Sequence, residues 1–406
     1  MKKQMQLSLD FGLLSPEAQS YIALTAAVHR RKKKNDWRGM MAVPPGSLLE
    51  SVIAEFRNQT NIALEIPFTT FMHHVGAFLI TQEVQIEFGG SRMDADFWTI
   101  VLASSGGGKT WTEKCIRTGL EGTVPIISSG AASAAKWLDE LAQTPRGLWI
   151  RDEFYQLLRT IETNGSPLAE LKDYLLRVYD NANISRTTKN DTITVEHPVL
   201  SILGFTALDP FIDGMQVESL VDGFAQRFGY VLARPDVHRK MVDFPVWKID
   251  SASWRGRFNA MTTNLHKVYK ISADAEKAFS RTFKDNAIGG LEESFYRRVM
   301  WRAHKYALIY HVIRGAAADE YLTEEDYGWA ARLVELQLVD AAEIIQMCTK
   351  TDIGKAIDAA DNLIKKLVAA GKPVTARAIV AGTRLINSVG MARMILNILS
   401  IDESRR

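Results

Sequence analysis

The stretch FWTIVLASSGGGKTWTEKCI, residues 97–116, constrains this chain more than any other part of it. Residues 97–103 are apolar and predict a buried strand, and a loop of small residues then leads into a helix. In such a loop, successive backbone N–H groups turn toward a phosphate, and the helix N-terminus adds its dipole. The spacing from Ala103 to Lys109 and Thr110 therefore predicts a phosphate-binding loop, with alanine where the usual pattern has its first glycine.

The same motif assigns roles to individual residues. Lys109 is expected to contact the β- and γ-phosphates of ATP, and Thr110 is expected to ligate Mg²⁺. The other expected contacts to the nucleotide come from Ser105, Gly106, Gly107 and Gly108. A chance glycine loop is the alternative, and the strand before the loop and the helix after it argue against that alternative.

A second apolar strand, LWIRDE, ends in Asp152 and Glu153 about forty residues later. Acids at the carboxyl end of such a strand lie in the crevice where α/β sheets bind ligands. We assign Asp152 to the metal and Glu153 to general-base catalysis on the attacking water. Acids also end buried strands without any catalytic role, which is the alternative interpretation.

Two further segments carry candidate catalytic residues. The strand 199–205 ends at Thr206, which is either a sensor of the γ-phosphate or a hydroxyl that caps a strand end. The segment DGFAQRFG sets Arg227 between aromatic residues, where it is either an arginine finger for a neighbouring subunit or part of a surface ion pair. Arg298 and Arg302 are weaker candidates for a second sensing arginine.

Alternating β-branched residues over 184–195 predict a hairpin with a polar, partly basic tip. In ring helicases an insertion before the sensor strand often projects into the pore. Arg186, Lys189 and Asn190 are therefore candidate DNA-binding residues that follow the phosphate backbone by charge. An ordinary surface hairpin is the alternative.

The order of elements predicts an α/β protein. Strand and helix signals alternate after residue 97, which indicates a mainly parallel sheet wrapped by helices. Four parts are expected: a basic extension (1–45), an ATPase core with a helical approach segment (46–250), an all-helical lid (251–350) and a helix-turn-helix or winged-helix module (351–406). The break at Pro44-Pro45-Gly46 and the turn at Gly371-Lys372-Pro373 mark two of these transitions.

Composition limits the class of protein further. No apolar run is long enough to span a membrane and the N-terminus lacks a signal peptide, so a cytoplasmic protein is expected. Cys115 and Cys348 have no metal-ligand spacing and are expected to be buried thiols. The net charge of +2 hides +5 in residues 1–45 and +4 in 352–406, against −7 between them. Basic ends suit a polyanionic partner, although the run HRRKKKNDWR is equally consistent with a solvated linker.

Six segments together resemble one family over roughly residues 44–347: PPGSLLE, ASSGGGKT, GLWIRDE, YDNANISRTTKNDTITVEHPVLSILGFT, DGFAQRFGYVLARP and RAHKYALIYHVI. The chain resembles the helicase-type ATPases of phages, prophages and plasmids, which are often fused to or encoded beside a primase. The resemblance implies an AAA+-like P-loop ATPase core, a hexameric ring with ATP at the subunit interfaces, and translocation along single-stranded DNA during replication.

The extension carries a possible second link to replication. Residues 6–11, QLSLDF, resemble the short peptide with which bacterial replication proteins dock on the sliding clamp. Gln6 would bond at the rim of the clamp pocket, while Leu9 and Phe11 would fill it. A short strand on this protein's own surface is the alternative. The chain has no primase signature, so a separate primase is expected as a partner.

The leading hypothesis is an ATP-driven DNA helicase of a mobile element. The second is an ATP-switched initiator or helicase loader that recruits host replication proteins without unwinding DNA. A third, an ATPase in phage defence or packaging, ranks last.

Overall fold

The computed structural model describes residues 43–127, 132–163, 165–187, 192–215, 223–234, 248–285, 291–348, 352–386 and 388–399. These residues divide into two compact units. The larger unit holds the described residues from 43 to 285 and from 294 to 340, and the smaller one holds 291–293 and 341–399. The phosphate loop and both predicted acids belong to the larger unit.

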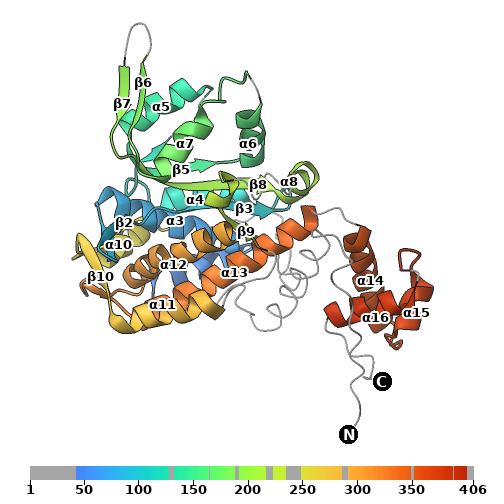
Figure 1. Ribbon diagram of the computed structural model, residues 1–406. Coiled ribbons are helices and arrows are strands. Elements are labelled where there is room, and N and C mark those ends of the chain that lie inside the picture. Colours follow the sequence, from blue (N-terminus) through green and yellow to red (C-terminus); the bar gives the residue numbers. More distant parts are fainter. Residues whose placement is uncertain are drawn as a thin grey trace. The chain divides into compact units, whose positions relative to one another are not determined.

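A five-stranded parallel sheet forms the centre of the larger unit, in the order β4-β5-β8-β3-β9. Figure 1 labels β5, β8, β3 and β9 of this sheet. The strands are β4 (Ile126–Ile127), β5 (Arg146–Arg151), β8 (Val199–Ala207), β3 (Trp98–Ala103) and β9 (Gly229–Leu232). Every residue of β3 and β9 is buried, as is usual when both faces of a parallel sheet are covered. The predicted α/β class and mainly parallel sheet are confirmed.

Helices connect these strands in the predicted alternation. They are α4 (Lys109–Gly119), α5 (Ala134–Gln143), α6 (Phe154–Glu162), α7 (Leu171–Tyr179) and α8 (Leu208–Gly214). Their apolar residues recur at helical spacing, as in α5, which buries Trp137, Leu138 and Leu141. The same helix begins after Ser133, whose hydroxyl accepts a hydrogen bond from the Lys136 N–H at 3.2 Å. Local sequence therefore defines both the buried face and the start of this helix.

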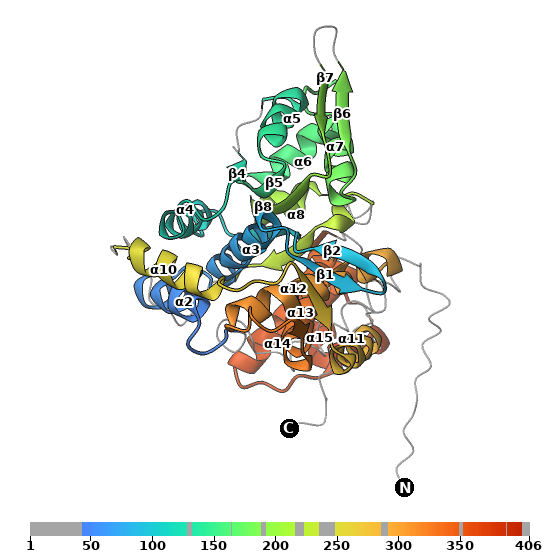
Figure 2. The same cartoon turned by 90° about the vertical axis from the view of Figure 1, so that its left-hand side faces the viewer.

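The predicted hairpin is confirmed. Strand β6 (Ile184–Thr187) pairs antiparallel with β7 (Thr192–Val195), and Ile184 lies opposite Val195. The two strands project away from the parallel sheet in two perpendicular views (Figures 1 and 2). Lys189 and Asn190 lie outside the described residues.

The helical approach segment is also confirmed, as α2 (Leu48–Gln59) and α3 (Glu65–Thr81). The side chain of Ser47 caps α2 by accepting a bond from the Glu50 N–H at 3.1 Å. Helix α3 is buried on nearly all sides and packs against β5 and β8. The segment after Pro45 is thus part of the core of the larger unit.

A second sheet, which the sequence did not predict, lies in the same unit. Its order is β11-β10-β1-β2, from β1 (Gln85–Phe88), β2 (Ser91–Asp94), β10 (Val268–Ile271) and β11 (Tyr321–Leu322). The prediction that the region 251–350 is all-helical is therefore wrong, because β10 and β11 lie in it. Strands of two to four residues are too short to show a period, and they form here because β10 pairs in parallel with β1 and β11.

The rest of that region is helical, as predicted. Its helices are α10 (Ser251–Met261), α11 (Ala273–Asp285), α12 (Glu293–Ile313) and α13 (Glu324–Cys348). The four-part division of the chain remains a prediction.

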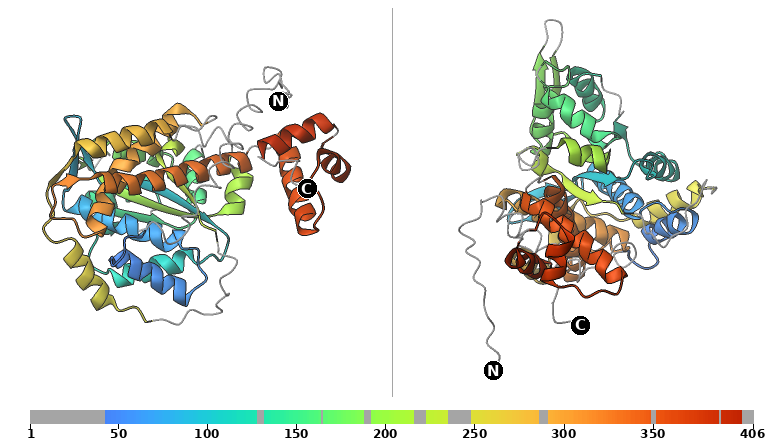
Figure 3. Two further views of the ribbon diagram at one scale, coloured as in Figure 1. Left: turned by 90° about the horizontal axis from the view of Figure 1, so that it is seen from below. Right: turned by 90° about the vertical axis from the view of Figure 1, so that its right-hand side faces the viewer.

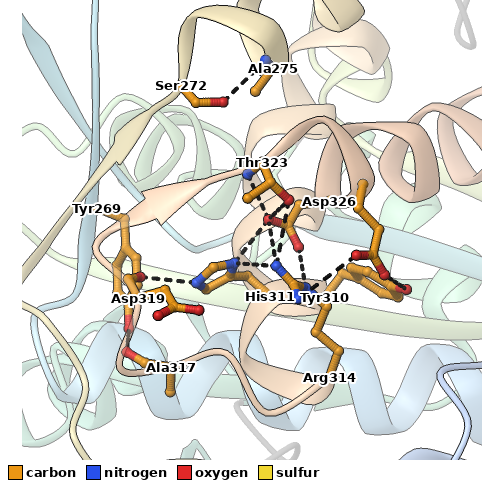
Figure 4. Close-up of polar contacts among 11 residues, drawn as sticks. Tyr269, Ser272, Ala275, Tyr310, His311, Arg314, Ala317, Asp319, Thr323 and Asp326 are labelled. Atoms are coloured by element: carbon orange, nitrogen blue, oxygen red, sulfur yellow. Dashed lines mark hydrogen bonds and ion pairs between the residues drawn. The ribbon is translucent and has the colours of Figure 1, made fainter.

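A buried polar cluster joins α12 to the start of α13 (Figure 4). Asp326 accepts hydrogen bonds from the Thr323 N–H at 2.7 Å and from Arg314 Nε at 2.7 Å, and its Oδ2 lies 2.9 Å from His311 Nδ1. The contact to Thr323 is the reciprocal half of a capping box. Burial raises the pKa of Asp326, but the bonds from His311, Arg314 and Thr323 outweigh burial and leave that pKa below its usual value.

We expect Asp326→Asn to lower the free energy of unfolding at pH 7 by ~3 kcal/mol, because the change leaves Arg314 without its buried counter-ion. Since the folded pKa is lowered, the contribution of Asp326 is complete above the unfolded pKa of about 4 and is lost as the pH falls through the folded pKa. Urea unfolding should therefore show a gap between the two proteins that narrows below about pH 4. Glu325→Gln, at the exposed partner 3.8 Å from Arg314, is the control and should change stability by less than ~1 kcal/mol. A gap that stays constant down to pH 2 would contradict the expectation.

The smaller unit contains α14 (Asp352–Ala369), α15 (Ala376–Gly382) and α16 (Val389–Ile398), drawn in red in Figure 3. Thr375 and Ser388 cap the last two helices, and Ile379 and Ile395 are fully buried between them. The helices lie on both sides of the turn predicted at Gly371-Lys372-Pro373. The described part of this unit contains no strand, so the choice between a helix-turn-helix and a winged helix remains open.

The two cysteines and the N-terminal peptide were also subjects of prediction. Cys115 and Cys348 are both buried and neither forms a disulfide, and burial raises the pKa of Cys115 to about 11. Gln6, Leu9 and Phe11 lie outside the described residues. No helix in the described ranges has both the length and the apolarity to cross a membrane.

Candidate nucleotide-binding site

The glycine-rich loop lies at the carboxyl end of β3 and leads directly into α4. Gly106 and Gly108 adopt φ values of +73° and +78°, a left-handed conformation that side chains rarely tolerate. A Cβ on Gly108 would also lie 2.5 Å from Ile62 Cδ1. Glycine is therefore required at position 108 by backbone conformation and by space. The loop keeps its backbone accessible beside a helix N-terminus, as phosphate binding requires.

Lys109 and Thr110 are the first two residues of α4. The Lys109 side chain folds back over the loop, and its Nζ donates to the Ser104 carbonyl at 3.1 Å. The Thr110 hydroxyl donates to a carboxylate oxygen of Asp152. Two of the predicted metal ligands, 42 residues apart in the chain, are thus in direct contact.

Asp152 and Glu153 follow β5 immediately. The second carboxylate oxygen of Asp152 accepts the Glu153 N–H at 2.9 Å. Glu153 is exposed and has φ +50°, which is uncommon for a residue other than glycine, and α6 begins at the next residue. Asp152 therefore lies beside Thr110, as predicted, while the Glu153 side chain is directed by a strained backbone turn.

Thr206 lies on β8, between the strands that carry the loop and the acids. It pairs in register with Leu102 and is almost fully buried. Its neighbour Phe205 lines the cavity at this end of the sheet, and successive strand residues point to opposite faces. The sensing role of Thr206 remains a prediction.

Two cavities flank the loop. One, of about 600 Å³, is lined by Thr110, Glu113, Arg117, Val124, Ile126, Ile127, Ile150, Asp152 and Phe205. The other, of about 140 Å³, is lined by Asn61, Ile62, Ala63, Ile66, Ala103, Ser104, Ser105, Gly106, Gly107 and Ala233. The phosphate loop therefore separates a polar cavity with two carboxylates from a smaller one with an apolar wall.

Glu113 and Arg117 were missed in the sequence analysis. They lie three and seven residues after Thr110, so helical spacing alone places all three on one face of α4. Burial and the nearby Asp152 raise the pKa of Glu113, and the Arg117 guanidinium only partly offsets them. Asn61 and Ile62 were also missed, and no sequence signal identifies them, since they belong to the α2–α3 connection that reaches the loop only in three dimensions.

Oxygen ligands of the kind that Mg²⁺ prefers are present at the larger cavity. The Thr110 hydroxyl and the Asp152 carboxylate are hard oxygens in direct contact. Within the described ranges, no group of three His, Cys, Asp or Glu side chains could hold a metal unaided. A pair of protein oxygens completed by phosphate and water is the usual way in which Mg²⁺ binds with a nucleotide. The residues at this cavity therefore fit the ion.

Arg227 lies at the amino end of the parallel strands, whereas the loop of its own chain lies at their carboxyl end. It ends a short 3₁₀ turn, η2 (Ala225–Arg227), just before β9, and β9 starts opposite Thr99 at the amino end of β3. The loop begins four residues further along β3, roughly 13 Å away. Arg227 and the glycine-rich loop of the same chain therefore lie at opposite ends of these strands.

The Arg227 guanidinium is largely buried, with a side-chain exposure of 13%. It donates to the Gly223 carbonyl, lies 3.5 Å from an Asp180 carboxylate oxygen and stands 5.0 Å from the centre of the Tyr179 ring. The backbone carbonyl of Arg227 accepts a bond from Arg302 Nη2 at 2.9 Å. Several elements thus hold this arginine in one orientation.

Arg298 and Arg302, the candidates for a second sensing arginine, lie beside the Arg227 segment. Arg298 donates to the Gln226 side chain, next to Arg227 in the chain. Arg302, almost fully buried, bonds Arg227 itself. Arg298 and Arg302 thus both contact the Arg227 segment, and neither lines the cavities beside the glycine-rich loop of the same chain.

Of the candidate DNA-binding residues, Arg186 alone is described. Its Nε lies 3.3 Å from a Glu170 carboxylate oxygen, in a partly exposed ion pair.

A scan against protein-family models and a search of curated proteins found no match to this chain.

Proposed function

We propose that the chain is an ATP-driven DNA helicase of a mobile element, which works as a ring with ATP bound between subunits. The observation that carries the ATP site is the contact of Thr110 with Asp152 beside a glycine loop that ends β3. Strand β8 lies between β3 and β5, so the loop and the acidic pair face each other across one intervening strand. That arrangement places the loop and the acids at the same end of the sheet, and it supports the AAA+-like core implied by the resemblance.

Each residue then has a role in hydrolysis. The loop N–H groups and the Lys109 ammonium bind the β- and γ-phosphates, and Thr110 with Asp152 holds the Mg²⁺–nucleotide complex. Bound Mg²⁺ would offset charge on the phosphate oxygens. Glu153 accepts a proton from the water that attacks the γ-phosphorus, and the bond to the departing ADP oxygen breaks with its electron pair on that oxygen.

The base of the nucleotide occupies the smaller cavity in this proposal. That cavity adjoins Ser104–Gly107 on the side away from Asp152, and its wall includes Ile62 and Ile66. An apolar wall next to a polar loop suits a planar base attached to phosphates.

The position of Arg227 supports assembly into a ring. In this proposal, a guanidinium at the end of the strands opposite its own phosphate loop reaches a γ-phosphate in another subunit, and a repeated head-to-tail contact whose rotation closes forms a ring. The projecting β6–β7 hairpin is the element proposed to contact DNA in the pore, and the three-helix unit is proposed to bind DNA outside it. We further propose the sliding clamp and a separate primase as partners.

The proposal predicts ATP hydrolysis that single-stranded DNA stimulates, and ring formation in the presence of ATP. Glu153→Gln should lower the hydrolysis rate by ~100-fold or more while ATP binding and ring formation persist, because the base is needed only in the chemical step. Phosphate release measures the hydrolysis rate, and mass photometry measures ring formation. Glu162→Gln, at the exposed end of α6, is the control. Unchanged hydrolysis in Glu153→Gln, or no ring under ATP, would contradict the proposal.

A forked DNA substrate separates the helicase from the initiator or loader. Strand displacement by the protein alone supports the helicase. ATP hydrolysis without displacement, together with recruitment of a host helicase, supports the loader.

A further inference from the structure

We propose that Glu113 is a positioning residue of the metal–nucleotide site, acting as an outer ligand that accepts hydrogen bonds from water on the Mg²⁺ ion. The inference rests on the proposed function and adds a residue that the phosphate-loop motif does not contain. Glu113 is the third residue after Thr110 on α4, so both side chains lie on the same face of that helix.

The cavity brings Glu113 to the same space as the two predicted ligands. Glu113, Thr110 and Asp152 all line the cavity of about 600 Å³, and the Thr110 hydroxyl is bonded to Asp152. The floor beneath them is apolar, formed by residues such as Ile150 and Phe205. The Glu113 carboxylate therefore shares a partly enclosed space with a second carboxylate, and a hydrated cation in that space offsets their mutual repulsion.

The ion pair with Arg117 fixes the orientation of Glu113. Arg117 Nε lies 2.9 Å from Glu113 Oε1, with side-chain exposures of 54% for the arginine and 15% for the glutamate. An exposed arginine one turn further along α4 therefore holds one carboxylate oxygen of Glu113. Outer ligands held in this way orient a metal and tune its affinity without touching it.

The test measures nucleotide binding as a function of Mg²⁺ concentration, with fluorescently labelled ATP as the probe. Glu113→Gln should raise the Mg²⁺ concentration for half-maximal binding by about tenfold, while binding measured in EDTA stays unchanged. Glu113→Asp should recover part of the shift because it keeps the carboxylate. Arg117→Gln should produce a smaller shift, since it alters only the support of Glu113.

Glu121→Gln is the matched control, because Glu121 follows the same helix, is 78% exposed and lies outside the cavity. Thermal unfolding of each variant shows whether it is folded. An unshifted Mg²⁺ dependence in folded Glu113→Gln, with normal binding by the unsubstituted chain, overturns the role of Glu113 and leaves the proposed function intact. No nucleotide binding by the unsubstituted chain at any Mg²⁺ concentration overturns both.

Discussion

Replacing Lys109 with alanine should reduce ATP hydrolysis by ~100-fold or more. Effects of this size follow when a preorganised hydrogen-bond donor is removed from an active site. The Lys109 ammonium is held over the loop by the Ser104 carbonyl, and the residue is only 8% exposed. Its charge is therefore positioned before the nucleotide arrives, in surroundings where an ion pair with phosphate is stronger than in water. ATP affinity should fall as well, because the contact forms in the bound state as well as in the transition state.

Lys114 provides the control for that experiment. It lies on the same helix, is exposed and does not line either cavity beside the loop. Lys114→Ala should retain full activity, which shows that the loss in Lys109→Ala does not come from a change in net charge or in α4. Hydrolysis in Lys109→Ala above half the original rate would remove the phosphate loop as the ATP site.

Replacing Arg227 with alanine should lower the hydrolysis rate by ~1000-fold, the lower limit for an arginine finger. The reason is that the guanidinium stabilises the charge that develops on the transferred phosphoryl group. Arg227 lies at the end of the strands opposite the loop of its own chain. The affinity of an isolated Arg227→Ala subunit for ATP should therefore change little.

Mixing two inactive variants tests whether Arg227 acts across subunits. An Arg227→Ala subunit still has Lys109, and a Lys109→Ala subunit still has Arg227. In a random equal mixture, roughly a quarter of the junctions combine one intact loop with one intact arginine, so the mixture should be more active than either variant alone. Phosphate release from the mixture measures this recovery.

Arg177→Ala serves as the control in the same mixing experiment. Arg177 is on α7, two residues before Tyr179, and its ion pair with Asp173 at 2.8 Å is exposed. It should remain active alone and in mixtures. A mixture of the two inactive variants with no recovered activity would mean that Arg227 does not act on the nucleotide of a neighbouring subunit, and its contacts with Asp180 and Tyr179 would then be structural.

Several features could be predicted from the sequence because their causes are local. The loop from Ser104 to Gly108 follows from small residues between an apolar strand and a helix, and two of its glycines, Gly106 and Gly108, have left-handed conformations. Helices begin after Ser133, Thr375 and Ser388 because each of these side chains accepts a hydrogen bond from the backbone N–H three residues later. The parallel sheet follows from the alternation of strands and helices.

Other features depend on segments that are distant in the sequence. The order β4-β5-β8-β3-β9 sets Thr110 against Asp152, and the parallel register of β9 with β3 places Arg227 at the end of the strands opposite the loop of its own chain. No period in the sequence encodes that order, because it results from packing whole elements against one another. The contact of Ile62 with Gly108, and the pairing of β10 with β1, also join residues that are far apart along the chain.

The sequence by itself thus determined the glycine-rich loop between β3 and α4, the acidic pair that follows β5 and the α/β class, since each depends on residues within one or two turns or strands. Only the tertiary structure decided which of these residues meet. It placed Glu113 in the cavity with Asp152 and fixed Arg227 against Tyr179 and Asp180. The physical reason is that backbone conformation responds to neighbours in the chain, whereas a site is assembled by burial and pairing between elements whose separation in sequence carries no information about their separation in space.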